Sequence, residues 1–101
     1  MIALSSRQRK YLRGAAHALE PVVHVGKGGV TAELAAELDR ALDAHELVKV
    51  RFVAGKREKA ELVDELCTRT GAATAGTVGH VAVLYRPQAD PQRRRIRLPE
   101  P

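Results

Sequence analysis

Residues 22–31 read VVHVGKGGVT, and this stretch decides how the rest of the chain can be arranged. A short apolar run ends in a glycine-rich loop, after which Thr31 offers a side chain that commonly begins a helix. Strand, loop and helix in this order predict an α/β fold with crossover connections. The loop at residues 26–29, GKGG, could bind a nucleotide, clamp a nucleic-acid backbone, or be only a tight turn.

The chain before this stretch predicts a helix over residues 5–18. Ser5 and Gln8 have the spacing of a capping box. At about 100° per residue, the apolar side of this helix carries Tyr11, Leu12, Ala15, Ala16 and Leu19. Pro21 ends the segment, residues 22–25 form a buried strand, and residues 32–44 follow as a second helix.

The chain after this stretch predicts three more strands and a third helix. Val48, Val50 and Phe52 alternate with Lys49 and Arg51, which predicts a strand with one buried face. Residues 54–56 form a loop, residues 57–70 a helix, and residues 73–78 and 81–85 a hairpin. Glycine at position 79, with residue 80 as the second turn position, predicts a type II′ turn. The element order is α-β-α-β-α-β-β.

The last part of the chain is rich in proline, glutamine and arginine. We therefore predict a single domain over residues 1–86 and a basic, flexible tail over residues 87–101. The tail could make a late contact with the domain through Ile96 and Leu98.

Charge is distributed unevenly along the 101 residues, whose formal net charge is +5. Residues 1–30 carry five basic side chains and one acidic, whereas residues 31–85 carry seven basic and nine acidic. Residues 86–101 again have five basic side chains against two acidic. Basic charge gathered at both ends favours a polyanionic partner over a merely soluble surface.

Composition also bounds the setting in which the protein works. No apolar run approaches the ~20 residues that a membrane-spanning helix needs, and the N-terminal segment does not resemble a secretory signal. Cys67 is the only cysteine, so no internal disulfide can form. These features predict a cytoplasmic protein without membrane association, which we expect to be a monomer.

Enzymatic motifs fit the sequence poorly. A phosphate loop of the Walker type needs a lysine directly before its Ser or Thr, but Val30 holds that place before Thr31. The histidines are scattered and have no partners at metal-ligand spacing, and Cys67 lies on the apolar side of the third predicted helix. We therefore expect no catalysis, no cofactor and no metal site.

A binding role suits the loop better. Glycines let backbone N–H groups approach a phosphate, the following helix adds positive charge, and Lys27 adds long-range attraction. We expect RNA contacts from one set of residues: Arg7, Lys10, Arg13, Gly26, Lys27, Gly28, Gly29 and Thr31. Additional contacts could come from Arg9, Arg93, Arg94 and Arg95. With only three aromatic residues in the chain, recognition would rest on backbone and shape, which suits structured RNA.

Three segments together resemble a known family: LSSRQRKYLRGAAHALEPVVHVGKGGVT (residues 4–31), ALDAHELVKVRF (residues 41–52) and RTGAATAGTVGHVAVLYR (residues 69–86). They look like a single CRM domain, named for chloroplast RNA splicing and ribosome maturation, and are most similar to its small bacterial stand-alone members of the YhbY type. The likeness runs from about Leu4 to Arg86.

This resemblance implies a mixed four-stranded sheet, in a fold like the C-terminal domain of translation initiation factor three. It also implies RNA binding through the GxxG loop and the basic surface near it, and association with precursors of the large ribosomal subunit, hence with ribosomal RNA. The alternative is a protein-interaction module that docks on a ribosomal or acidic protein without touching RNA.

Overall fold

The computed structural model describes residues 2–53 and 59–101, which form three α-helices, a short 3-10 helix and a four-stranded sheet. In chain order these are α1 (Ser6–Ala16), β1 (Val23–Val25), α2 (Ala32–His45), β2 (Leu47–Phe52), α3 (Lys59–Thr70), β3 (Ala73–Val78), β4 (Val81–Tyr85) and η1 (Pro91–Arg93). The predicted α/β class and element order are confirmed. The loop predicted at residues 54–56 and the predicted start of the third helix at residue 57 lie outside the described residues.

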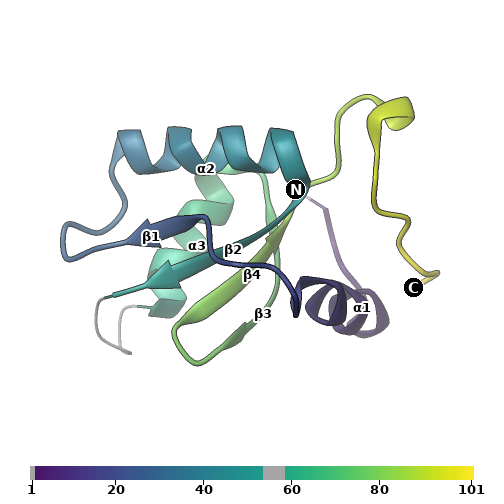
Figure 1. Cartoon of the computed structure of the whole chain (residues 1–101), viewed down its shortest axis with the longest axis horizontal. Coiled ribbons are helices and arrows are strands. Elements are labelled where there is room, and N and C mark those ends of the chain that lie inside the picture. The colour runs from purple at the N-terminus through teal and green to yellow at the C-terminus, as the bar shows by residue number, and fades with distance from the viewer. Residues whose placement is uncertain (1, 54–58) are drawn as a thin grey trace.

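The strands are ordered β1-β2-β4-β3 across the sheet. β1 runs parallel to β2, because α2 crosses between them, and β4 is antiparallel to both β2 and β3. This is the mixed four-stranded sheet that the family resemblance implied. Figure 1 shows the loop between β1 and α2 at one end of the molecule and α1 towards the other.

Each face of the sheet has its own hydrophobic cluster. On one face, α2 and α3 cover alternate residues of β1, β2 and β4, including Val25, Val50 and Leu84. On the other face, Leu12 and Ala16 of α1 pack against a smaller cluster whose sheet residues are Leu47, Ala75, Val83 and Tyr85. The alternation predicted for β2 is confirmed, since Val48, Val50 and Phe52 are all buried.

The local signals at the ends of elements are present as predicted. Ser5 Oγ accepts from the backbone N–H of Gln8, and Gln8 Oε1 accepts from that of Ser5, each at 3.1 Å, which completes the capping box. Gly79 has φ of 58°, which suits the first position of a type II′ turn.

The apolar side of α1 is narrower than its sequence predicted. Leu12 and Ala16 are fully buried, but Tyr11 is 46% exposed and Ala15 is exposed too. The helix also ends at Ala16 and not at the predicted residue 18, so Leu19 lies beyond it and is 41% exposed. Residues four apart lie one above the other on a helix, so only this single row faces the sheet. α1 therefore covers a strip of the sheet and leaves part of that face open.

The segment after β4 folds back along α1. Ile96 and Leu98 pack against the α1 cluster, so the predicted late contact is present, and Gln8 Nε2 donates to Pro99 O at 3.0 Å. The division of the chain into a domain and a flexible tail stays a prediction.

The side chain of Glu46 holds this C-terminal segment. Glu46 is completely buried, caps the end of α2 and has φ of 61°, in the left-handed region. Its carboxylate accepts from three backbone N–H groups: Gln88 at 2.8 Å, Arg95 at 2.6 Å and Ile96 at 3.1 Å. A buried carboxylate needs such donors, since an unpaired one would be costly.

Candidate nucleic-acid interface

The glycine loop is a tight turn in which the glycines have different structural roles. Gly29 N donates to Gly26 O at 3.1 Å, and Gly29 has φ of 71°, where a side chain would be strained. A Cβ added to Gly26 or Gly28 would meet nothing within 4 Å. Gly29 is therefore required by the backbone, whereas Gly26 and Gly28 leave open space through which a phosphate could approach the backbone.

Thr31 is used as a helix cap. Its Oγ1 accepts from the backbone N–H of Leu34 at 3.1 Å, as the sequence predicted for the start of α2. Lys27 and Gly28 lie at the exposed turn of the loop. The loop therefore offers phosphate an exposed ammonium group and the N-terminal end of α2 nearby.

The four basic residues of α1 divide into two pairs. Arg7 and Lys10 are exposed and border a shallow hollow beside Tyr11 and Pro99. Arg9 is half-buried and donates to Leu4 O at 2.7 Å and to Ser6 Oγ at 3.0 Å. Arg9 thus braces the start of its own helix, and its additional contact with RNA stays a prediction.

Arg13 lies against β3. Its Nη1 donates to Ala75 O at 2.7 Å, next to the point where a β-bulge shifts the register between Thr74 and Gly76. A Cβ on Gly76 would lie only 2.8 Å from Arg13 Cδ, so Gly76 makes room for the guanidinium stem. Because a guanidinium has five N–H donors, Arg13 can hold the bulge and still offer donors to a phosphate.

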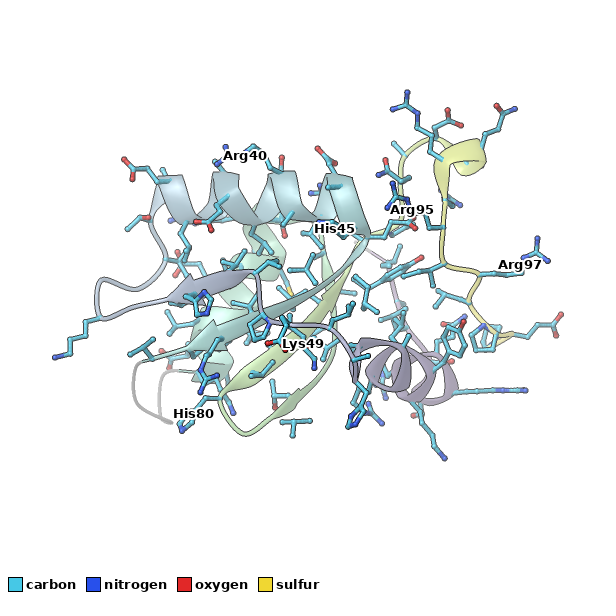
Figure 2. All side chains as sticks on the ribbon, viewed as in Figure 1. Arg40, His45, Lys49, His80, Arg95 and Arg97 are labelled. Atoms are coloured by element: carbon cyan, nitrogen blue, oxygen red, sulfur yellow. The ribbon has the colours of Figure 1, made fainter. Side chains whose placement is uncertain are left out.

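The uncovered part of the α1 face carries two basic residues that the sequence analysis did not assign to RNA. Lys49 and Arg51 project from β2, and a groove on this face is lined by Arg13, His17 and both of them. Lys49 Nζ also donates to His17 O at 3.3 Å, and Figure 2 shows Lys49 in the middle of the molecule. Their alternation with the buried residues of β2 indicates that they point to the opposite face of the sheet. The sequence does not show which elements cover that face.

His24 extends this surface to the edge of the sheet. It is exposed on β1, opposite Arg51 in the parallel register. The glycine loop begins just after β1, at Gly26. The loop and α1 are therefore not neighbours, and the open sheet face lies between them along a molecule 37 Å long (Figure 1).

The three arginines of the C-terminal segment lie elsewhere. Arg93 and Arg95 border a hollow at the C-terminal end of α2, beside Asp43, and Arg94 Nε donates to Gln88 O at 2.8 Å. Figure 2 shows Arg95 near that helix end and Arg97 pointing away from the body of the molecule. The structure does not bring these arginines together with the glycine loop.

The helices on the opposite face carry mainly acidic side chains. α2 and α3 together hold seven acidic and three basic residues, whereas α1 holds four basic and none acidic. The guanidinium of Arg86 lies on the acidic side and forms salt bridges with Asp39 at 2.5 Å and with Asp43 at 2.8 Å. The molecule thus has one basic and one acidic layer.

Two buried side chains of the described residues have shifted pKa values. Burial, and secondarily the charge of Asp64, raises the pKa of Cys67 to about 11, which keeps the thiol protonated at neutral pH. Burial also raises the pKa of Tyr85, helped by Glu46 and opposed by Arg94. No group of three or more His, Cys, Asp or Glu side chains in residues 2–53 and 59–101 is placed to hold a metal ion.

In the same described residues, no helix is both long and apolar enough to cross a membrane.

Comparisons with known proteins agree with this architecture. The CRS1/YhbY (CRM) domain matches residues 4–86. An RNA-binding protein of Haemophilus influenzae is 42% identical over 100 residues, which cover 98% of each chain. YqeI of Bacillus subtilis, provisionally named an RNA-binding protein, is 32% identical over 95% of this chain and 99% of its own.

A solved structure gives the same fold. The solution structure of a hypothetical protein of Staphylococcus aureus, provisionally described as RNA-binding, superposes with a TM-score of 0.83 at 31% identity. The match covers 96% of this chain and 100% of the other. Sequence and fold lead to one conclusion: this chain belongs to the CRS1/YhbY (CRM) domain family.

Proposed function

We propose that this protein is a non-catalytic RNA-binding factor that associates with precursors of the large ribosomal subunit. The observation that carries the RNA-binding part is the separation of charge across the sheet. Basic side chains of the open sheet face and α1 lie on one side, the acidic helices α2 and α3 cover the other, and the loop with Lys27 lies at one end of the molecule (Figure 1). Such a layer attracts a polyanion and also orients it, because the opposite layer repels phosphate.

The basic layer is suited to a backbone longer than a single phosphate group. Lys27 lies at one end, Lys49 and Arg51 in the middle, and Arg7 and Lys10 at the other end. An RNA strand that follows this line would exchange its counterions for five cationic side chains. The glycine turn would clamp it at the loop, where open space around Gly26 and Gly28 admits a phosphate.

The scarcity of exposed aromatic residues supports recognition of backbone and shape. Phe52 and Tyr85 are buried, and Tyr11 is 46% exposed on α1. A sheet that stacks successive bases on several aromatic rings is therefore not available in the part of the chain that the structure describes. Structured RNA, read through phosphates and ribose, fits this surface better.

The ribosomal part of the proposal is supported by the family resemblance, and RNA binding by the names of the relatives as well. Crosslinking in cells, followed by sequencing of the attached RNA, tests both parts. We expect crosslinks on large-subunit ribosomal RNA in incomplete particles. Crosslinks mainly on messenger RNA would contradict the ribosomal part and leave RNA binding intact.

The rival role, docking on a protein without touching RNA, needs a separate experiment. Purified protein is titrated with isolated large-subunit ribosomal RNA at several salt concentrations. We expect log affinity to fall linearly against log salt concentration, as counterion release requires. Retention on particles through one protein, with no binding to the isolated RNA, would favour the rival.

A further inference from the structure

The molecule has an apolar pocket next to its basic groove. A cavity of about 400 Å³ lies between the C-terminal end of α1, the start of β2 and the C-terminal segment. Most of its lining is apolar and comes from Ala15, Leu19, Val22, Leu47, Val48 and Ile96, and Glu20, His45 and Lys49 complete it. Leu19 and Val22 are 41% and 47% exposed, so two large apolar side chains of this pocket face solvent.

The pocket exists because the edge strand is shorter than its neighbour. β1 begins at Val23, opposite Val50, so the first residues of β2 extend beyond it. Val22 N donates to Lys49 O at 3.2 Å. Pro21, on the N-terminal side of Val22, belongs to the connection that leads back to α1. The chain leaves the sheet edge at this point, so a gap is left beside Leu47 and Val48.

One wall of the pocket comes from the C-terminal segment. Ile96 reaches the pocket, and its backbone N–H is one of the three that donate to the buried carboxylate of Glu46. The adjacent N–H of Arg95 donates to the same carboxylate oxygen at 2.6 Å. The wall is thus held in place by a buried polar anchor.

The pocket is continuous with the basic groove. Leu19, Glu20 and Lys49 line both the pocket and the groove that contains Arg13, His17 and Arg51. A ligand that fits both must combine a flat or compact apolar part with an anionic part. A nucleotide has this chemistry, because its base presents apolar faces and its phosphate is charged.

We propose, on the basis of the RNA-binding role above, that this pocket takes one unpaired nucleobase of the bound RNA. Lys49 contacts the phosphate next to that base. His45 and Glu20 at the rim offer hydrogen-bonding groups to the base edge, and the Glu20 carboxylate keeps phosphate out of the pocket. This protein then reads an extruded base without an aromatic platform.

The test compares two ligands of equal charge: an eight-nucleotide oligouridylate and a ribose-phosphate chain of the same length without bases. Wild-type protein should bind the oligouridylate more tightly. Ala15→Leu should fill the pocket from its exposed wall, and leucine suits a helix. We expect about tenfold weaker binding to oligouridylate, in the range measured for single base contacts, and less than about twofold change for the abasic chain.

A matched control and a second variant guard against other causes. Ala36→Leu makes the same change at an exposed position of α2, on the acidic layer, and should alter neither affinity. Val22→Ser changes the pocket from the opposite wall and should also weaken only oligouridylate binding. In wild type, nuclear Overhauser contacts should join the uracil H5 and H6 protons to methyl groups of Val22, Leu47 or Ile96.

Three results would overturn the pocket assignment. The first is equal affinity of wild type for both ligands, and the second is unchanged oligouridylate binding in both pocket variants. The third is binding of oligouridylate without nuclear Overhauser contacts between its base protons and the pocket methyl groups. All three leave the proposed RNA-binding role standing, because that role fails on a different result, the absence of binding to isolated large-subunit ribosomal RNA.

Discussion

The two faces of the sheet are built for different purposes. On the α2/α3 face, two helices bury alternate residues of three strands, and their outer surface is acidic. On the α1 face, one short helix and a returning C-terminal segment bury only part of the sheet and leave Lys49 and Arg51 accessible in a groove. The α2/α3 face therefore buries the larger apolar cluster, whereas the α1 face depends on a polar anchor and carries the proposed RNA contacts.

The largest expected effect comes from removing the anchor of the α1 face. Glu46→Ala leaves three backbone N–H groups without their acceptor, and each such loss costs about 1–3 kcal/mol when the group stays buried. We expect the free energy of unfolding, measured in denaturant, to fall by about 3 kcal/mol or more. Glu37→Ala, at an exposed site of α2, should change it by less than about 0.5 kcal/mol.

If the two Glu→Ala variants were equally stable, the C-terminal segment would not depend on Glu46. The α1 face would then be held by apolar contacts alone.

A charge change on each face tests the comparison itself. Replacing Lys49 and Arg51 with glutamine removes two cations from the open face, and should lower the slope of log affinity against log salt by about two. The matched pair, Arg40→Gln with Arg69→Gln, removes the same charge from the acidic layer. Titration of both double variants with ribosomal RNA should show the loss only in the first. Similar losses in both would mean that net charge, and not the face, governs binding.

A single change at the loop should have a smaller effect. Lys27→Ala should weaken binding about equally for different RNA sequences and lower the salt slope by about one, because it removes one phosphate contact. Filter binding or fluorescence anisotropy over a series of salt concentrations measures both quantities. An unchanged slope would take Lys27 out of the interface and confine binding to the sheet and α1.

The smallest effect separates two neighbouring glycines. Gly29→Ala places a side chain at φ of 71°, which should cost about 1 kcal/mol of stability or somewhat more. Gly28→Ala enters open space and should leave the melting temperature nearly unchanged. RNA affinity should nevertheless fall for Gly28→Ala, if a phosphate approaches there. Equal melting temperatures would show that the turn adapts to a side chain at position 29.

Local patterns predicted most of the fold. The alternation in β2, the capping box at Ser5 and the glycine at position 79 each act over a few residues, so the sequence alone reveals them. Topology is different, because it joins distant residues. The separation of the loop from α1 and the open sheet face between them follow from the strand order, which periodicity does not contain.

Two side chains show why the remainder was not predictable. Arg13 was assigned to RNA because it lies among other basic residues, yet it also satisfies Ala75 O beside a bulge whose position no local pattern indicates. Glu46 follows a helix with four acidic residues and reads as another solvated charge. Its burial depends on donors from residues 88, 95 and 96, more than 40 positions away.

The anchoring of the C-terminal segment also decides how the two halves of the molecule would respond to its loss. All residues of the α2/α3 cluster lie between positions 23 and 84, so cleavage by a protease after Arg86 would leave that cluster whole. The α1 cluster would lose Ile96 and Leu98, and the Glu46 carboxylate would lose its three backbone donors. Proteolysis of this segment would therefore weaken the basic half of the molecule and spare the acidic half.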